Sequence, residues 1–142
     1  MTTVLIVDDN PELLQVFTQG LPLTGDFTVL TAADGTKGLE IAYEQRPNCV
    51  VIDIKMPELN GYQLARALRG DPETAAIPLI ILTALPQDQA EFASLAAGCD
   101  RFLTKPVVPR ELAASIQSAL ASDDQERVIR LRTLAGSGEE PS

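Results

Sequence analysis

Histidine and tryptophan are absent from this sequence of 142 residues, and aromatic residues make up only 4% of it. The lack of histidine argues against a zinc site, because imidazole is among the commonest zinc ligands. A core with so few aromatic rings must be built mainly from valine, isoleucine, leucine and alanine, as the interiors of parallel sheets are. The composition therefore favours an α/β fold.

Cysteine is also scarce. Cys49 and Cys99 are the only two, and neither belongs to a CxxC or Cys/His pattern of the kind found in metal and redox sites. We expect both to be small buried residues that begin or precede strands.

The sequence also has few basic residues and no long apolar run. Eleven Lys and Arg residues against twenty Asp and Glu residues give a net charge of −9, which repels nucleic acids and anionic lipids. No apolar run approaches the length of a membrane span. We therefore expect a cytoplasmic protein that contacts neither nucleic acid nor membrane directly.

The chain does contain a succession of short apolar runs separated by helical patterns. Strands are expected at Val4–Val7, Phe27–Leu30, Val50–Ile54, Leu79–Leu82 and Phe102–Leu103. A first helix should begin at Pro11, after an Asn10 cap, and should be stopped by Gly20 and Pro22. Four further helices are expected at about Gly35–Gln45, Gly61–Arg69, Gln87–Ala97 and Pro109–Ala121.

This alternation of strands and helices predicts an α/β fold of three layers, a doubly wound sandwich around a five-stranded parallel sheet. We expect the flavodoxin-like strand order 2-1-3-4-5, which places a binding site at the carboxyl ends of the strands at 4–7 and 50–54. Residues 1–121 should form this domain. Residues 122–142 are expected to be a charged linker or tail, partly helical and disordered at its end.

Polar residues follow the predicted strands where a site is expected. Asp8 and Asp9 follow the first strand, Asp53 ends the third, and Thr83 and Lys105 follow the fourth and fifth. Three neighbouring carboxylates repel one another unless a cation lies among them, which indicates a hard, oxygen-bound metal such as Mg²⁺. An ammonium group and a hydroxyl suit the oxygens of a phosphoryl group, so one carboxylate should be a nucleophile.

Together these residues resemble the receiver domains of two-component response regulators, including the chemotaxis regulators. The resemblance covers about residues 3–121 and is carried by Asp8-Asp9, Val51–Pro57, Asn60-Gly61, Thr83-Ala84 and Lys105-Pro106. It implies that Asp53 accepts a phosphoryl group from a histidine kinase or a phosphotransfer protein. The protein would then be a signalling switch that assists its own phosphorylation and dephosphorylation, and not an enzyme acting on other substrates.

The resemblance also implies a role for each matching residue at the metal site. Asp9, Asp53 and the backbone carbonyl of Lys55 would ligate Mg²⁺, and Asp8 would contribute through a water molecule. The metal would therefore lie beside the phosphoacceptor.

Further matching residues would bind the phosphoryl group and respond to it. Thr83, Ala84 and Lys105 would contact the phosphoryl oxygens. Thr83 and Phe102 would form a switch pair, in which the hydroxyl moves toward the phosphoryl group and the ring turns inward. A cis peptide bond would join Lys105 to Pro106.

Phosphorylation would then change the face formed by the expected helix at 87–97, strand at 102–103 and helix at 109–121. A downstream target or a second copy of the chain would bind there. Two alternatives remain: a receiver that binds partners without being phosphorylated, and a phosphatase of the haloacid dehalogenase type. The second is disfavoured because its DxD pattern is missing after the first strand.

Overall fold

The computed structural model describes residues 1–54, 56, 59–84 and 97–121. Within them lies a parallel sheet of five strands in the order β2-β1-β3-β4-β5, which confirms the predicted α/β class and topology. The strands are β1 (Thr2–Val7), β2 (Phe27–Ala32), β3 (Cys49–Asp53), β4 (Leu79–Thr83) and β5 (Arg101–Thr104). The helices are α1 (Pro11–Thr24), α2 (Gly35–Gln45), α3 (Gly61–Gly70) and α5 (Pro109–Ala121).

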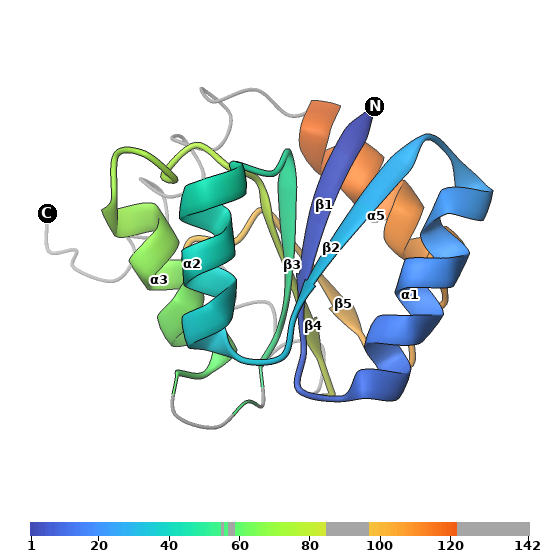
Figure 1. Cartoon of the computed structure of the whole chain (residues 1–142), viewed down its shortest axis with the longest axis horizontal. Helices are drawn as coiled ribbons and strands as arrows, with labels where there is room; N and C mark the ends of the chain where they lie inside the picture. The colour runs from blue at the N-terminus through green and yellow to red at the C-terminus, as the bar shows by residue number, and fades with distance from the viewer. Residues whose placement is uncertain (55, 57–58, 85–96, 122–142) are drawn as a thin grey trace, which may run out of the picture.

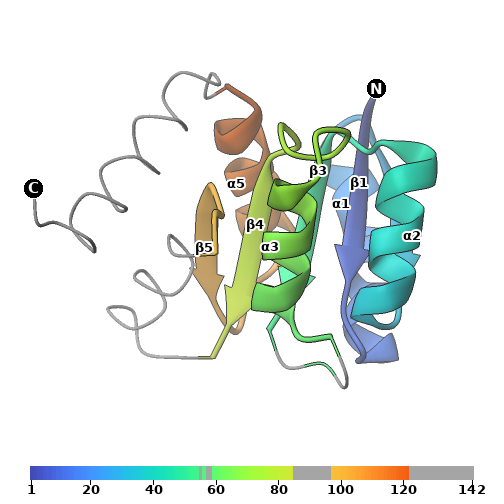
Figure 2. The same cartoon turned by 90° about the vertical axis from the view of Figure 1, so that its left-hand side faces the viewer.

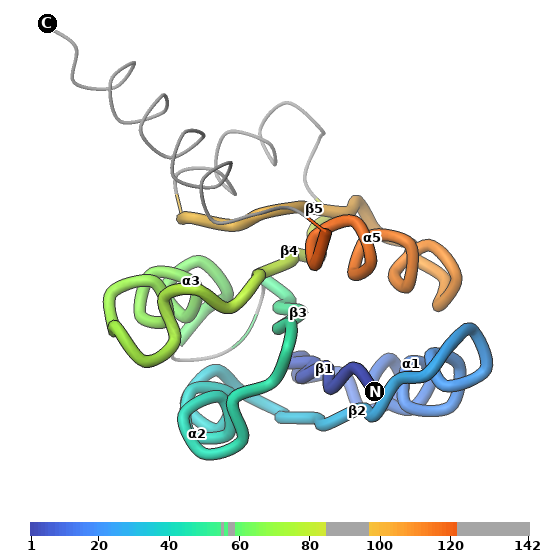
Figure 3. The backbone as a smooth tube through the Cα atoms, turned by 90° about the horizontal axis from the view of Figure 1, so that it is seen from above, coloured from blue at the N-terminus to red at the C-terminus, as the bar shows by residue number. Residues whose placement is uncertain are grey.

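The helices cover both faces of the sheet. In Figure 3, α2 and α3 lie on one side, and α1 and α5 on the other. Successive strand residues therefore point into two separate cores. The first core cluster lies under α2 and α3 and includes Leu5, Val7, Val50, Ile52, Leu64 and Ile81. The second lies under α1 and α5 and includes Val4, Ile6, Phe17, Val51, Ile80 and Leu112. Burial on both faces explains why the central strands read as continuous apolar runs.

The end of the first helix differs from the prediction. α1 continues through Gly20 and Pro22 to Thr24. Gly20 does not end the helix; it lies so close to the ring of Pro109 in α5 that a Cβ atom there would overlap it. Pro22 is tolerated in the last turn because the carbonyl that loses its helical donor belongs to Thr18, which is exposed to water.

Other expectations fall partly outside the described residues. Of the expected helix at 87–97, only Ala97, a buried turn residue, is among the described residues, and the whole tail at 122–142 lies outside them.

Cys49 begins β3 and Cys99 precedes β5, and both residues are buried, as predicted; their thiols are free. Burial raises the pKa of each thiol to about 12. Among the described helices, none has the length and apolar character that crossing a membrane requires.

A buried ion pair holds the amino-terminal end of the sheet to α3. The Arg69 guanidinium donates to the carboxylate of Asp100 at 2.7 Å, to the carbonyl of Gly98 at 2.7 Å and to two carbonyls of the turn at 75–77. The Asp100 carboxylate also accepts from the N–H of Leu79 at 2.8 Å. The side chain of Arg69 is 12% exposed and that of Asp100 is fully buried, so this cluster of charges depends on its internal partners.

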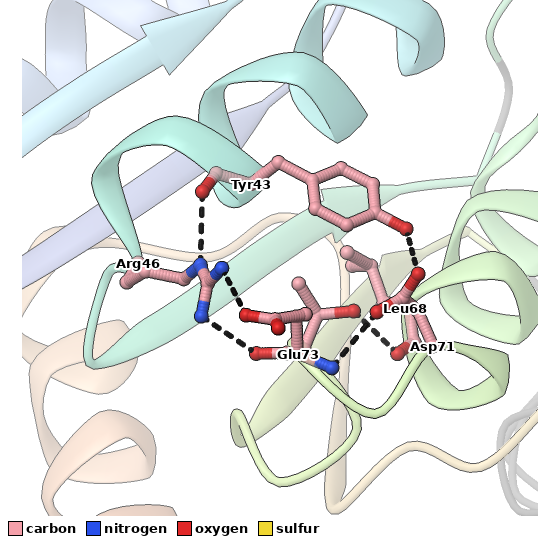
Figure 4. A network of polar contacts seen from close by, with 6 residues as sticks. Tyr43, Arg46, Leu68, Asp71 and Glu73 are labelled. Atoms are coloured by element: carbon pink, nitrogen blue, oxygen red, sulfur yellow. Dashed lines mark hydrogen bonds and ion pairs between the residues drawn. The ribbon is translucent and has the colours of Figure 1, made fainter.

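A second polar network lies at the same end of the sheet but on the surface (Figure 4). The hydroxyl of Tyr43 donates to the carboxylate of Asp71, and the side chain of Arg46 pairs with Glu73. Arg46 also donates to the carbonyl of Tyr43 at 2.9 Å. The network joins the end of α2 to the turn after α3. The Arg46 and Glu73 side chains are 49% and 58% exposed, so water screens their attraction.

These two arginines should contribute very different amounts to stability. Arg69→Met leaves the Asp100 carboxylate buried without its cation and should lower the free energy of unfolding by about 3–5 kcal/mol. Arg46→Met, the control, removes an exposed pair and should cost less than about 1 kcal/mol. Urea unfolding at pH 7, followed by circular dichroism, measures both values. Equal losses in the two variants would contradict the structural role given to Arg69.

Candidate functional site

The carboxyl ends of the strands form one edge of the sheet, the lower edge in Figures 1 and 2. A pocket of about 400 Å³ lies at this edge, and its lining residues are Asp8, Asp9, Asn10, Asp53, Ile54, Thr83, Ala84 and Lys105. The fold therefore brings together most of the site residues expected from the sequence. Lys55, whose carbonyl was expected to bind metal, lies outside the described residues.

Asp8 is the most deeply buried acid of the pocket. It directly follows β1, is 1% exposed, and its backbone N–H continues the pairing with β2 by donating to Ala32 at 3.0 Å. One carboxylate oxygen, Oδ1, accepts from the N–H of Asn10 at 2.9 Å. The other, Oδ2, is buried without a hydrogen-bond partner among the described residues. Burial raises the pKa of Asp8, the Asn10 N–H partly offsets this, and the neighbouring Asp53 raises the pKa further.

Asp53 ends β3 and carries the direct contact with the ammonium group. Its side chain is 7% exposed, and Oδ1 accepts from Nζ of Lys105 at 2.6 Å. The same ammonium lies 3.8 Å from Oδ2 of Asp8. One carboxylate oxygen from each of Asp8, Asp9 and Asp53 lies within 4.8 Å of the others. Two buried acids and one exposed acid thus share a single nearby cation within the described lining of the pocket.

The first residue of α3 packs against the backbone of Asp53 and Ile54. The N–H of Gly61 donates to the carbonyl of Ile54 at 3.0 Å, and a Cβ atom on Gly61 would overlap the carbonyl of Asp53. Glycine is therefore needed for this close approach. Asn60 caps the helix in a reciprocal pair with Gln63. The helix consequently begins directly against the backbone of the proposed phosphoacceptor.

Thr83 and Lys105 reach the pocket from neighbouring strands. Thr83 ends β4 and is 2% exposed. The backbone N–H of Lys105 donates to the carbonyl of Thr83 at 2.7 Å, which extends the pairing of β5 with β4. The Lys105–Pro106 peptide bond is cis, and the Lys105 side chain is 32% exposed. A positive charge and a hydroxyl-bearing residue therefore lie at the same edge as the carboxylates.

Phe102 does not line the pocket. It lies opposite Ile81 in the β4–β5 pairing, is partly buried and packs against the first core cluster. Asn10, conversely, was expected only as a helix cap. It caps α1 by accepting from the N–H of Glu12, and it also lines the pocket and binds Asp8 through its own N–H. Its place directly after the acid pair was the available signal for this second role.

Comparison with known proteins identifies the family. Residues 4–117 match the model of the response regulator receiver domain, so the chain belongs to this family. Protein PilH of Pseudomonas aeruginosa is 40% identical over 121 residues, which are 85% of this chain and 99% of PilH. This chain spans about half the length of the longer curated relatives that it matches, which are described as transcriptional regulators.

Solved structures show the same relationship. The chemotaxis protein CheY4 of Vibrio cholerae superposes with a TM-score of 0.78 at 29% identity, covering 84% of this chain and 98% of CheY4. The receiver domain of the sensor histidine kinase PA1611 of Pseudomonas aeruginosa has a TM-score of 0.76 at 30% identity, covering 85% and 98% of the two chains. That domain is described with a magnesium ion in its active-site cleft.

The raised pKa of Asp8 predicts that the free energy of unfolding of the metal-free protein depends on pH. A raised folded-state pKa means that protonation stabilises the fold, so this contribution is present at low pH and is lost as pH rises through that pKa. Asp8→Asn should therefore raise the free energy of unfolding at pH 7, and raise it by less at lower pH, where the carboxyl group is already protonated.

Urea unfolding with EDTA across pH 4–8 tests this prediction. Asp34→Asn is the matched control, because Asp34 is a partly exposed helix cap whose function asparagine also performs. We expect the control to change the stability little at any pH in this range. A loss of stability in Asp8→Asn at pH 7 would contradict the electrostatic strain described above.

Proposed function

We propose that the chain is a phosphorylation-dependent switch in which Asp53 accepts a phosphoryl group from phosphohistidine on a kinase or a phosphotransfer protein. The observation that carries the proposal is the Lys105 ammonium bound to the Asp53 carboxylate, at 2.6 Å, inside a pocket that holds two further carboxylates. This set supplies a nucleophile, a cation for phosphoryl oxygens and oxygen ligands for a metal.

The carboxylates fit Mg²⁺ as the metal. Asp9 and Asp53 would hold it together with the Lys55 carbonyl, and Asp8, whose Oδ2 is buried without a partner among the described residues, would act through a bound water. Hard oxygen ligands without histidine or cysteine suit magnesium rather than zinc. When bound, Mg²⁺ would supply positive charge that offsets the repulsion between the phosphoryl oxygens and the carboxylates. The ion described in the PA1611 receiver domain supports this assignment.

The chain's own residues would perform the transfer. A carboxylate oxygen of Asp53 attacks phosphorus, a P–O bond forms, and the P–N bond of phosphohistidine breaks as the imidazole leaves with the electron pair. Lys105 moves from the free carboxylate to the phosphoryl oxygens and stabilises their charge. Thr83 and Ala84, which line the pocket beside it, hold a further phosphoryl oxygen through the hydroxyl and the backbone N–H.

The conformational change that follows phosphorylation would extend from the pocket along β4 and β5. Thr83 turns its hydroxyl toward the phosphoryl group, and Phe102, on the adjacent strand, turns inward. We infer that the surface of β5, α5 and the expected helix at 87–97 changes with them and binds a downstream partner or a second copy. Arg101 lies on this surface, where it donates to Ser118 of α5 at 3.0 Å. A cytoplasmic location without nucleic-acid contact stays a prediction for this chain.

Phosphorylation should need both Asp53 and Mg²⁺. With acetyl phosphate and Mg²⁺, the wild type should gain one phosphoryl group by intact mass, and it should gain none with EDTA, because repulsion among the anions then opposes transfer. Asp53→Asn should gain none, and Lys105→Ala should be impaired in phosphorylation or in the response to it. Asp34→Asn, which changes a partly exposed acid outside the pocket, should behave as wild type. Equal labelling of Asp53→Asn would show that the nucleophile is misassigned.

Magnesium affinity should depend on Asp9. Asp9→Asn removes one charge and one ligand oxygen, so we expect its dissociation constant for Mg²⁺ to rise by about tenfold or more. Calorimetric titration of the metal-free protein measures the constant, with Asp34→Asn again as the control. An unchanged affinity in Asp9→Asn would place the metal elsewhere.

A further inference from the structure

One side of α3 carries two large polar residues with opposite surroundings. Tyr62 lies in the first turn and Arg69 in the last, two turns apart and therefore on the same side of the helix. The donors of Arg69 bind Asp100 and backbone carbonyls. The hydroxyl of Tyr62 is buried, and in the part of the chain that the structure describes it has no hydrogen-bond partner.

The residue that carries the unsatisfied hydroxyl belongs to the first turn of α3, which touches the proposed phosphorylation site. Tyr62 directly follows Gly61, where a Cβ atom would overlap the carbonyl of Asp53. Its ring packs against the first core cluster, which Phe102 of β5 also contacts. Burial, followed by the nearby Cys99, raises the pKa of the phenol. Tyr62 is thus connected to Asp53 through the backbone and to the cluster beside Phe102 through packing.

A buried hydroxyl without a partner destabilises the conformation that contains it. A two-state protein moves toward the state in which such a group is satisfied, by the difference in free energy between the two environments. At the far end of the same side of α3, Arg69 already binds its partners, so a rearrangement there would cost hydrogen bonds. The Tyr62 side chain can therefore change its surroundings while Arg69 and Asp100 keep theirs.

We propose that Tyr62 is a coupling residue of the switch, whose hydroxyl gains a hydrogen-bond acceptor in the phosphorylated conformation and so favours that conformation. This inference rests on the proposed function, because it assigns Tyr62 to the response that follows modification of Asp53. It adds a residue outside the pocket, on α3, to the groups through which the site acts on the rest of the domain.

The chain offers a matched control. Its only other tyrosine is Tyr43, and it has no tryptophan. The Tyr43 hydroxyl is bound to Asp71 at the opposite end of the sheet. Beryllium fluoride with Mg²⁺ serves as the phosphoryl mimic on the full chain. We expect Tyr62→Phe to bind the mimic roughly tenfold more weakly than wild type and to melt at a higher temperature without it. Tyr43→Phe should bind it within about twofold of wild type.

A spectroscopic measurement reports the hydroxyl itself. In Tyr43→Phe the only phenol is Tyr62, and its near-ultraviolet absorbance moves to longer wavelength when the hydroxyl donates a hydrogen bond. The mimic with Mg²⁺ should produce this shift in Tyr43→Phe and not in the double variant with Asp53→Asn.

The outcomes separate the two proposals. Wild-type affinity in Tyr62→Phe, or an unchanged Tyr62 spectrum while the mimic saturates the protein, overturns the role of Tyr62 and leaves the proposed function standing. Failure of the wild type to bind the mimic in the presence of Mg²⁺ overturns both.

Discussion

The structure depends on holding three carboxylates at one edge of the sheet against their mutual repulsion. Asp8 and Asp53 are almost completely buried there, and Lys105 is the cation that the described lining of the pocket supplies. Charges repel more strongly where protein replaces water, so the rest of the fold must offset this local cost. The same repulsion makes the edge a strong attractor for positive charge. Stability and the proposed function are therefore opposed at this edge, and the domain retains an unfavourable interaction among its carboxylates that a bound cation would relieve.

The remainder of the domain provides the rigid support that such a site needs. The central strands are buried on both faces, so their ends are fixed by packing on two sides. Gly61 allows α3 to begin against the backbone of Asp53, and Asn10 starts α1 while its N–H binds Asp8. The first turns of α1 and α3, which lie on opposite faces of the sheet, thereby limit the movement of the two buried carboxylates. A rigid surrounding keeps like charges close where a flexible one would let them separate.

Much of this arrangement could be predicted from sequence because it depends on local patterns. Continuous apolar runs gave the central strands, and the ends of parallel strands necessarily share an edge, which brings Asp8, Asp53 and Thr83 together. Features that depend on contacts between distant segments were missed. Gly20 was interpreted as a helix end because glycine usually is one, and only the proximity of Pro109 shows its actual role.

The buried pair of Arg69 and Asp100 was missed for a related reason. Both residue types are usually exposed, so neither gives a sequence signal of burial. Tyr62 carries no signal either, since an aromatic residue in a helix normally indicates core packing and its ring does pack there. Tyr62 is distinguished by its hydroxyl oxygen, which has no hydrogen-bond partner among the described residues. Whether such a partner is present depends on all the segments that surround the side chain. Such details follow from the tertiary structure alone.

The distribution of satisfied and unsatisfied polar groups bears on how the domain could change shape. Among the described residues, the buried side-chain atoms without a hydrogen-bond partner are Oδ2 of Asp8 and the hydroxyl of Tyr62. One lines the pocket, and the other belongs to Tyr62, whose backbone lies in the helical turn that touches Asp53. At the amino-terminal end of the sheet, Arg69 and Asp100 are satisfied by each other and by backbone groups. Unfavourable interactions that persist in a folded protein commonly mark the places where it must change. The acid pocket and the Tyr62 side chain are therefore the places where a rearrangement would lower the free energy, and the Arg69–Asp100 cluster is the part that holds its position while this happens.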